Sequence, residues 1–391
     1  MKYSFFDIKK RLSLVIVCGY ITSLLVSVFN PKNSTILLSS DFIALYTGSK
    51  IISESRSGQL YNLSIQEQTK LSLDGVNPEF MFSYRNPPVV AFVLQPLTFF
   101  NAFGAYRIFF VINLCLSLLF LFCLFKRSNL PDYFMILLIL YLPFNTALLS
   151  NQLSPLLALL YLFIWFNIKE KRDLLVGILS GFLFLKPQHM MLIPFVFILS
   201  NKKLDFLKGL VPVMSILFVL SCIVWGGWFV TDYLVFLLRS EAPELGSPVV
   251  YGFSLVSLSG LIKTSYYKFS YIVLLGLSFL LYFFICLYYL TLRKKNVSSE
   301  SLFVISIVFS LCLNPHIMGS DLILLIIPIV YLYVCFRNSG RIRYLLFSAL
   351  FYLIPLLGIY FYGGITAVVF VFIGLYLLFD KNFIKSTVLS G

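Results

Sequence analysis

The stretch "IFFVINLCLSLLFLFCLF", from Ile108 to Phe125, is apolar almost throughout and ends directly before Lys126 and Arg127. A run of this length is sufficient for one helical crossing of a bilayer. Comparable runs recur along the chain, so that 60% of the 391 residues are hydrophobic and only 12% are charged. A soluble domain is nearer a quarter charged, and continuous runs favour helices over the alternating strands of a membrane barrel. The sequence therefore predicts an all-α polytopic membrane protein.

Clusters of lysine and arginine separate these runs and hold 20 of the 30 basic residues. The positive-inside rule places all of the clusters in the cytoplasm, so the chain must cross outward and return between consecutive clusters. This topology predicts about twelve transmembrane helices with both termini cytoplasmic, in a single integral membrane domain over residues 1–391. The predicted spans are 12–29, 105–125, 132–149, 152–168, 173–185, 189–200, 209–228, 270–292, 300–313, 321–336, 344–360 and 364–379.

Two outer loops are long in this topology, residues 31–104 and residues 229–268. Within the first loop, the apolar segment Pro87–Phe100 has 14 residues, short of the roughly 20 that a full crossing needs. If it crossed, every later basic cluster up to the C-terminus would change sides, so we expect it to lie in or dip into the outer leaflet. Helically spaced apolar residues over Ser49–Leu73 predict an in-plane amphipathic helix in the same loop.

The cysteines and the net charge argue against several classes of protein. All seven cysteines fall in apolar runs without paired spacing, so neither a disulfide framework nor a zinc site is expected. The formal net charge of +14 is explained by cytoplasmic loops rather than by nucleic-acid binding. We therefore expect no nucleic-acid partner.

Polar residues near the outer ends of the predicted spans form a short set. Ionisable groups are tolerated near a membrane where they pair, line a wet cavity or carry out chemistry. The topology places the whole set on one face of the membrane, although it does not establish that its members are close together. The set consists of Asp41, Tyr84, Arg85, Asn86, Asn151, Gln152, Lys186, His189, Asn314, His316 and Asp321.

This set suits the transfer of a group from a phosphate-bearing lipid. Lys186, Arg85 and His316 could hold a phosphate through charge-assisted hydrogen bonds, and Asp41 could take a proton from an attacking hydroxyl. Each residue also has a structural alternative. Lys186 could extend to the interface, Arg85 could be an ordinary interfacial arginine, the two histidines could be structural, and Asp321 could cap the tenth span.

Five segments resemble, in order, the pattern of glycosyltransferase family 87. The first two are "DFIALYTGSKIISESRSGQLYN" (41–62) and "FSYRNPPVVAFVLQPLTFF" (82–100), which resemble the family's Asp-Phe opening and its aromatic-Tyr-x-Pro-Pro segment. "NTALLSNQLSPLLALL" (145–160) is similar to its Gly-Gln stretch, and "GILSGFLFLKPQHMMLIP" (177–194) to its helix ending in Lys-Pro. "LNPHIMGSDLILLIIP" (313–328) is similar to its late Pro-Asp segment.

The resemblance implies a GT-C architecture, in which a polytopic helical enzyme takes a sugar from a polyprenyl-phosphate donor on the outer face. It implies mannose or arabinofuranose as the sugar, a glycolipid or glycan as the acceptor, and membrane lipid as the surroundings. It also implies a reaction with no nucleotide sugar, no metal and no cofactor. The family's catalytic aspartate lies in the first outer loop, and Asp41 is the matching position. In the third segment, Asn151 stands where glycine is usual.

We therefore predict a membrane glycosyltransferase that moves a hexose or pentose, with mannose as the first candidate, by an inverting displacement. The predicted roles are general base for Asp41, donor-phosphate binding for Lys186, Arg85 and His316, and donor-sugar or acceptor binding for Tyr84, Gln152, His189 and Asp321.

Two other classes of protein stay open at this point. The 229–268 loop with Arg239 leaves room for an O-antigen-type polysaccharide polymerase. A transporter or flippase for a lipid-linked sugar would require charges within the spans or repeated halves, and neither is evident. The abundance of Ile, Phe, Lys and Asn is typical of an A+T-rich bacterial genome. We therefore expect a bacterial inner membrane, with the active site on its outer face.

Overall fold

The structure is a computed structural model of the chain and describes residues 5–76, 82–241, 268–293, 295, 297–314, 316–360 and 363–385. Most of the second long outer loop, residues 242–267, lies outside the described residues. The polymerase alternative depended on that loop. The described part of the chain is helical and contains no strand, which confirms the predicted all-α class.

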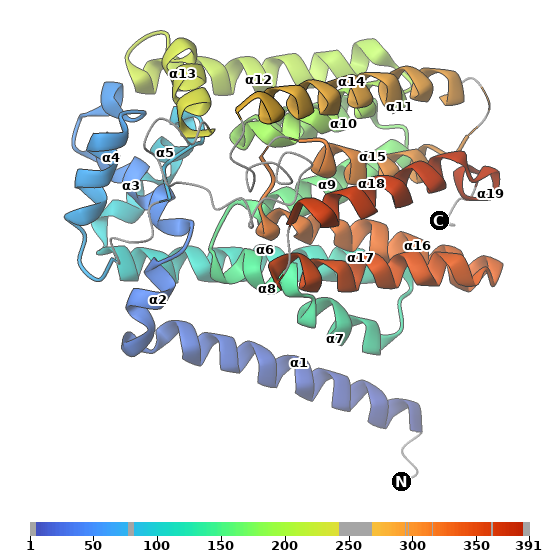
Figure 1. The fold of residues 1–391 in the computed structure, drawn as a ribbon. Coiled ribbons are helices and arrows are strands. Elements are labelled where there is room, and N and C mark those ends of the chain that lie inside the picture. Colours follow the sequence, from blue (N-terminus) through green and yellow to red (C-terminus); the bar gives the residue numbers. More distant parts are fainter. Residues whose placement is uncertain are drawn as a thin grey trace.

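Long helices and short helical segments alternate along the chain (Figure 1). The α-helices are α1 (Phe5–Phe29), α2 (Ser34–Leu38), α3 (Phe42–Ser53), α4 (Leu63–Leu71), α5 (Pro88–Leu94), α6 (Ala102–Ser128), α7 (Asp132–Leu140), α8 (Leu142–Leu149), α9 (Ser154–Lys169), α10 (Asp173–Gly181), α11 (Ile193–Leu199), α12 (Lys203–Trp225), α13 (Val230–Glu241), α14 (Lys268–Arg293), α15 (Ser299–Cys312), α16 (Ile326–Ser339), α17 (Ile342–Tyr360), α18 (Gly363–Phe379) and α19 (Lys381–Ile384). The 3₁₀ segments are η1 (Pro31–Asn33), η2 (Ser57–Gln59), η3 (Gln95–Phe99), η4 (Phe182–Leu185), η5 (Pro187–Leu192) and η9 (Gly319–Leu325).

Each of the twelve predicted spans corresponds to a helix or to two consecutive helical segments. Among the described residues, five helices are long and apolar enough to cross a membrane, and a sixth crossing is formed if α7 and α8 are counted together. The other predicted spans are apolar helices of 10–17 residues. The chain is therefore a multi-pass membrane protein that also contains several apolar helices shorter than a full crossing.

The break between α7 and α8 has a local cause. The two helices meet at an angle of 56°, and Pro143 lies in the first turn of α8. Proline has no N–H to donate to the carbonyl of Ile139 four residues earlier. The side chain of Asn145 donates to that carbonyl at 2.9 Å instead, so the bend leaves no unsatisfied backbone oxygen there.

The described residues of the loop predicted to lie outside, 31–104, form a group of short helices at one end of the long helices (Figure 1). Within it, α3 packs against α4, α5 and η3. The segment predicted not to cross, Pro87–Phe100, is divided between α5 and η3 and stays in this group. The helix predicted over Ser49–Leu73 is present as two helices, because Ser55 adopts a left-handed conformation (φ 59°) and Asn62 caps the start of α4. Almost all of α3 is buried in protein.

Helix α1 is attached to the rest of the protein at few points. Between Leu12 and Phe29, only the side chains of Val17 and Val28 are buried, and α1 packs mainly on α7. Near its C-terminal end, the guanidinium of Arg107 donates to the carbonyl of Phe29 at 2.8 Å. The same guanidinium lies 3.9 Å from the centre of the Phe103 ring.

Helices α10 and α12 approach each other through two glycines. A Cβ atom at Gly177 would lie 2.0 Å from the carbonyl oxygen of Phe206, and one at Gly209 would lie 2.2 Å from that of Leu174. Small residues permit such backbone approach between membrane helices. This contact sets the position of α10 and of the 3₁₀ segment η4 that follows it.

We expect Gly177→Ala to lower the melting temperature of the detergent-purified protein. The added methyl group meets backbone rather than a mobile side chain, and the overpacking should cost at least about 1–3 kcal/mol. The matched control is Gly276→Ala in α14, where a Cβ atom meets nothing within 4 Å. Equal melting temperatures for the two variants would contradict this account of the helix contact.

Candidate active site

Asp41 precedes α3 and is held by its neighbour Phe42. The backbone N–H of Phe42 donates to the carbonyl of Ser150 at 3.0 Å, and its buried ring packs edge-on against Tyr106 at 5.4 Å. The Asp41 carboxylate makes no capping hydrogen bond to α3, although Asp41 is the residue before the helix. Its side chain therefore extends away from its own helix, toward the turn between α8 and α9.

That turn presents Gln152. Asn151 adopts a left-handed conformation (φ 54°), which glycine and asparagine tolerate better than other residues. The Asn151 side chain donates to the carbonyl of Tyr106 at 2.8 Å. The Asn113 side chain donates to Asn151 Oδ1 at 2.8 Å and to the backbone carbonyl of Gln152 at 2.9 Å. The turn is thus fixed on both sides to α6.

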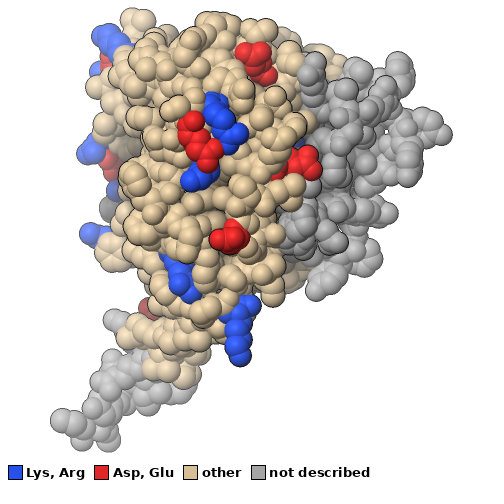
Figure 2. Space-filling view, turned by 90° about the vertical axis from the view of Figure 1, so that its left-hand side faces the viewer, with Lys and Arg blue, Asp and Glu red and all other residues tan. Residues whose placement is uncertain are grey.

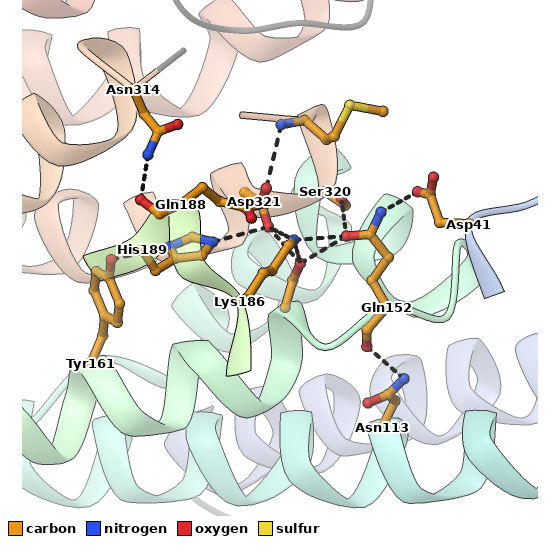
Figure 3. A network of polar contacts seen from close by, with 12 residues as sticks. Asp41, Asn113, Gln152, Tyr161, Lys186, Gln188, His189, Asn314, Ser320 and Asp321 are labelled. Atoms are coloured by element: carbon orange, nitrogen blue, oxygen red, sulfur yellow. Dashed lines mark hydrogen bonds and ion pairs between the residues drawn. The ribbon is translucent and has the colours of Figure 1, made fainter. Parts of the chain in front are cut away.

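The Gln152 amide joins the carboxylate of Asp41 to a second polar group (Figure 3). Its Nε2 donates to Oδ2 of Asp41. Its Oε1 accepts from Lys186 Nζ at 2.9 Å and from Ser320 Oγ at 3.1 Å. Only 8% of the Gln152 surface is exposed, so these contacts are formed largely away from water.

Lys186 forms an ion pair with Asp321 behind Gln152. Lys186 lies between η4 and η5 in an extended conformation, because Pro187 follows it. Asp321 has no exposed surface, and its Oδ1 accepts from Lys186 Nζ and, at 2.8 Å, from Ser154 Oγ. Its Oδ2 accepts from the backbone N–H of Met318 at 3.3 Å. Asp321 therefore both closes the start of η9 and neutralises Lys186.

His189 extends the network away from Asp41. Its Nε2 lies 3.5 Å from Oδ1 of Asp321, and its Nδ1 lies 3.1 Å from the hydroxyl of Tyr161. The His189 side chain is only 1% exposed. The network in Figure 3 thus runs from the half-buried Asp41 at one end to a fully buried histidine at the other.

Arg85 and His316 form a second polar pair. The Nη1 atom of Arg85 lies 3.3 Å from Nδ1 of His316, and both side chains are half-buried. The hydroxyl of Tyr233 in α13 donates to the Arg85 carbonyl at 2.8 Å. The backbone N–H of His316 donates to the side chain of Asn314 at 2.9 Å. Two loops from distant parts of the sequence are therefore brought together by a cation and an imidazole.

Tyr84 lies within the first outer loop. It is 1% exposed, its hydroxyl donates to the Pro87 carbonyl at 2.7 Å, and it accepts from the Ala91 N–H at 2.9 Å. Its ring lies against Gly48 of α3. Binding a sugar through this hydroxyl would require the exchange of one of these bonds, and the predicted role of Tyr84 stays a prediction.

The environment of Asp41 shifts its acidity. Burial raises the pKa of Asp41 to about 6, and the charge of Asp321 adds to this effect. Lys186, the Gln152 hydrogen bond and Arg85 act in the opposite direction, because each favours the ionised carboxylate. A carboxyl group with this pKa is ionised at neutral pH and still basic enough to accept a proton.

The structure brings together Asp41, Gln152, Lys186, His189 and Asp321 from the predicted set. The sequence prediction missed four further members of the network, which are Asn113, Ser154, Tyr161 and Ser320. Asn113 could have been recognised, since an amide in the middle of a membrane helix requires a partner. Within the described ranges, no group of three or more His, Cys, Asp or Glu side chains is placed to hold a metal ion.

The fold and this site define a polytopic helical membrane protein with a carboxylate and an arginine–histidine pair near one end of its helices. The chain belongs to glycosyltransferase family 87, since the model of that family matches residues 84–315, more than half of the 391 residues. Comparisons with curated proteins and with solved structures found no match. The protein is therefore a membrane glycosyltransferase rather than a transporter.

The matched region contains part of the site. Arg85, Gln152 and Lys186 lie within residues 84–315, whereas Asp41 precedes them and Asp321 follows them. The left-handed conformation of Asn151 gives a physical reason for the glycine that is usual at this position of the family pattern.

We expect Lys186→Met to destabilise the protein strongly. The substitution leaves the Asp321 carboxylate buried without its countercharge, which typically costs about 3–5 kcal/mol. Lys202→Met is the matched control, because the Lys202 side chain is 77% exposed and its Nζ lies 4.0 Å from Oδ2 of Asp205. Thermal unfolding in detergent should separate the two variants, and the double variant Lys186→Met/Asp321→Leu should recover part of the loss. Similar unfolding of both single variants would contradict the importance of the buried pair.

Proposed function

We propose that the protein transfers a sugar, with mannose as the first candidate, from a polyprenyl-phosphate-linked donor to a lipid-linked or polysaccharide acceptor. The transfer is an inverting single displacement with Asp41 as general base. The observation that carries the proposal is the position of the Asp41 carboxylate. One oxygen is held by Gln152, the other receives no hydrogen bond from the described residues, and the side chain is half-buried.

In this mechanism, Asp41 removes the proton from the acceptor hydroxyl as its oxygen bonds to the anomeric carbon of the sugar. The bond from that carbon to the phosphate oxygen breaks, and the polyprenyl phosphate leaves with the electron pair. Developing negative charge on the leaving phosphate is stabilised by nearby cations and hydrogen-bond donors. Arg85 and His316 suit this task because they are adjacent, half-buried and able to donate.

Lys186 is a weaker candidate for direct contact with the phosphate. Its ammonium group is directed at Asp321, Gln152 and Ser154, which together take up its three N–H donors. Contact with the donor would require the exchange of at least one of these bonds. We therefore assign the phosphate to Arg85 and His316 and keep Lys186 as the charge behind Gln152.

The arrangement of the helices supports an active site on the outer face of a cell membrane, with cytoplasmic termini. In Figure 1, α6 runs from the end that holds α3, α4 and α5 to the opposite end, where its last turn carries Lys126 and Arg127. Figure 2 views the end that holds α3–α5, where acidic and basic side chains are mixed. Glu54 pairs there with Lys50 at 3.8 Å and with Arg56. An excess of basic residues at the end away from the site is the cytoplasmic signature.

We expect Asp41→Asn to lower transfer from radiolabelled polyprenyl-phosphate-mannose at least about 100-fold, because general base catalysis contributes roughly 10²–10⁴-fold. Labelled product is measured in membranes with equal amounts of wild-type and variant protein. Asp74→Asn, an exposed acid in the same loop, is the matched control and should retain activity. Full activity of Asp41→Asn would rule out this base. If the wild type gives no product, the same comparison with polyprenyl-phosphate-arabinofuranose tests the donor sugar.

The transfer rate should also fall as the pH is lowered through the pKa of Asp41. Since the pKa of Asp41 is raised to about 6, the carboxylate is ionised and active above this value and becomes protonated below it. We expect kcat/KM to be level above about pH 7 and to fall about tenfold per unit well below pH 6. Initial rates between pH 4.5 and 8.5 test this expectation. A profile that stays level down to pH 4.5 would contradict the buried environment assigned to Asp41.

A further inference from the structure

We propose that Gln152 is a positioning residue for Asp41, and that Lys186 and Ser320 fix the direction in which its amide points. The inference rests on the function proposed above. It assigns to a neutral amide the task of presenting one particular oxygen of the base to the acceptor hydroxyl.

The orientation of the Gln152 amide follows from the chemistry of its neighbours. The ammonium group of Lys186 only donates hydrogen bonds, so the atom 2.9 Å from it must be the amide oxygen. A flipped amide would place its NH₂ group against the ammonium and an oxygen against the Asp41 carboxylate, and both contacts would be repulsive. The donating end of Gln152 is therefore directed at Asp41.

The main chain of Gln152 is fixed as firmly as its side chain. The carbonyl of Gln152 accepts from Asn113 at 2.9 Å, and the preceding Asn151 is anchored to the Tyr106 carbonyl. Asp41 is tied to the same turn through the bond from the Phe42 N–H to Ser150. Asp41 and the Gln152 amide are therefore both anchored to one short segment, residues 150–152.

This arrangement makes the two oxygens of Asp41 different. Oδ2 accepts from Gln152, whereas Oδ1 receives no hydrogen bond from the described residues. A carboxylate that rotated freely would present either oxygen in many directions. Held by one oxygen, it presents the other in a single direction, and small errors in such alignment cost up to about 10²-fold in rate.

The charged groups that face Asp41 explain why a neutral residue is suited to this position. Lys186 and Arg85 favour its ionised form, while Asp321 and burial oppose it. Lys186 is paired with Asp321 and also donates to the Gln152 amide oxygen. The group that donates to Asp41 is therefore the neutral amide of Gln152, not the lysine. A cation in place of Gln152 would form a tight ion pair with the base and make it less basic.

The test compares Gln152→Ala and the isosteric Gln152→Glu with wild type in the mannosyl-transfer assay. Alanine cannot donate to Asp41, and glutamate can do so only when it is protonated. We expect kcat to fall about 10- to 100-fold with the donor KM within about threefold. The acid limb of the pH profile should move to higher pH, because the lost hydrogen bond favoured the ionised carboxylate. Gln66→Ala is the matched control, since Gln66 is also a buried glutamine with hydrogen bonds at both ends of its amide. The acid limb of the pH profile of this variant should stay unchanged.

A wild-type kcat together with a wild-type acid limb in Gln152→Ala would overturn the inference while leaving Asp41 as the base. Activity of Asp41→Asn would instead overturn the function proposed above, whatever Gln152 does. If both Gln152 variants fail to fold, Ser320→Ala decides the question, with Ser320→Thr as the variant that retains the hydroxyl. Ser320→Ala should lower kcat and move the acid limb upward, Ser320→Thr should restore both, and no difference between the two variants would overturn the proposal.

Discussion

The buried ion pair between Lys186 and Asp321 is the interaction on which the rest of the site depends. Removing two charges from water is costly and is offset only by close pairing and by further hydrogen bonds. Here the further bonds come from Ser154, from the Met318 backbone and from Gln152. Together they require the turn that carries Gln152 and Ser154, the start of η9 and the segment around Lys186 to lie at one point. The hydrogen bonds to the ion pair therefore fix the ends of several helical segments. Gln152, in the turn before α9, connects the pair to Asp41.

The positions of the helical segments could be predicted from the sequence, whereas the direction in which each one crosses the membrane stays a prediction. Apolar runs mark the helices, and basic clusters mark one end of them. The breaks within the helices were less predictable. Pro143 is visible in the sequence, but the Asn145 side chain that satisfies the Ile139 carbonyl depends on the bent geometry itself. Ser55 gave no signal, since serine has little preference for the left-handed conformation that divides α3 from α4.

The candidate site was predictable as a set of residues but not as a network. Charge asymmetry placed Asp41, Gln152, Lys186 and Asp321 on one face, yet it contained no information about which side chain contacts which. Lys186 was expected to meet a phosphate, whereas its contacts in the structure are with protein acceptors. Serine hydroxyls such as those of Ser154 and Ser320 commonly bond to their own helix, so their sequence positions did not distinguish them. Partner choice of this kind is decided by tertiary packing.

The loose attachment of α1 has a consequence for how the enzyme tolerates different membranes. Asp41 follows α1 in the sequence, but its position is set by the bond between Phe42 and Ser150 rather than by α1 itself. The first helix touches the bundle mainly at α7 and through Arg107. When the thickness of the bilayer changes, a transmembrane helix accommodates the mismatch by tilting. Because Asp41 is tied to the turn before α9, we expect a tilt of α1 to leave the carboxylate in place as the lipid around the protein changes.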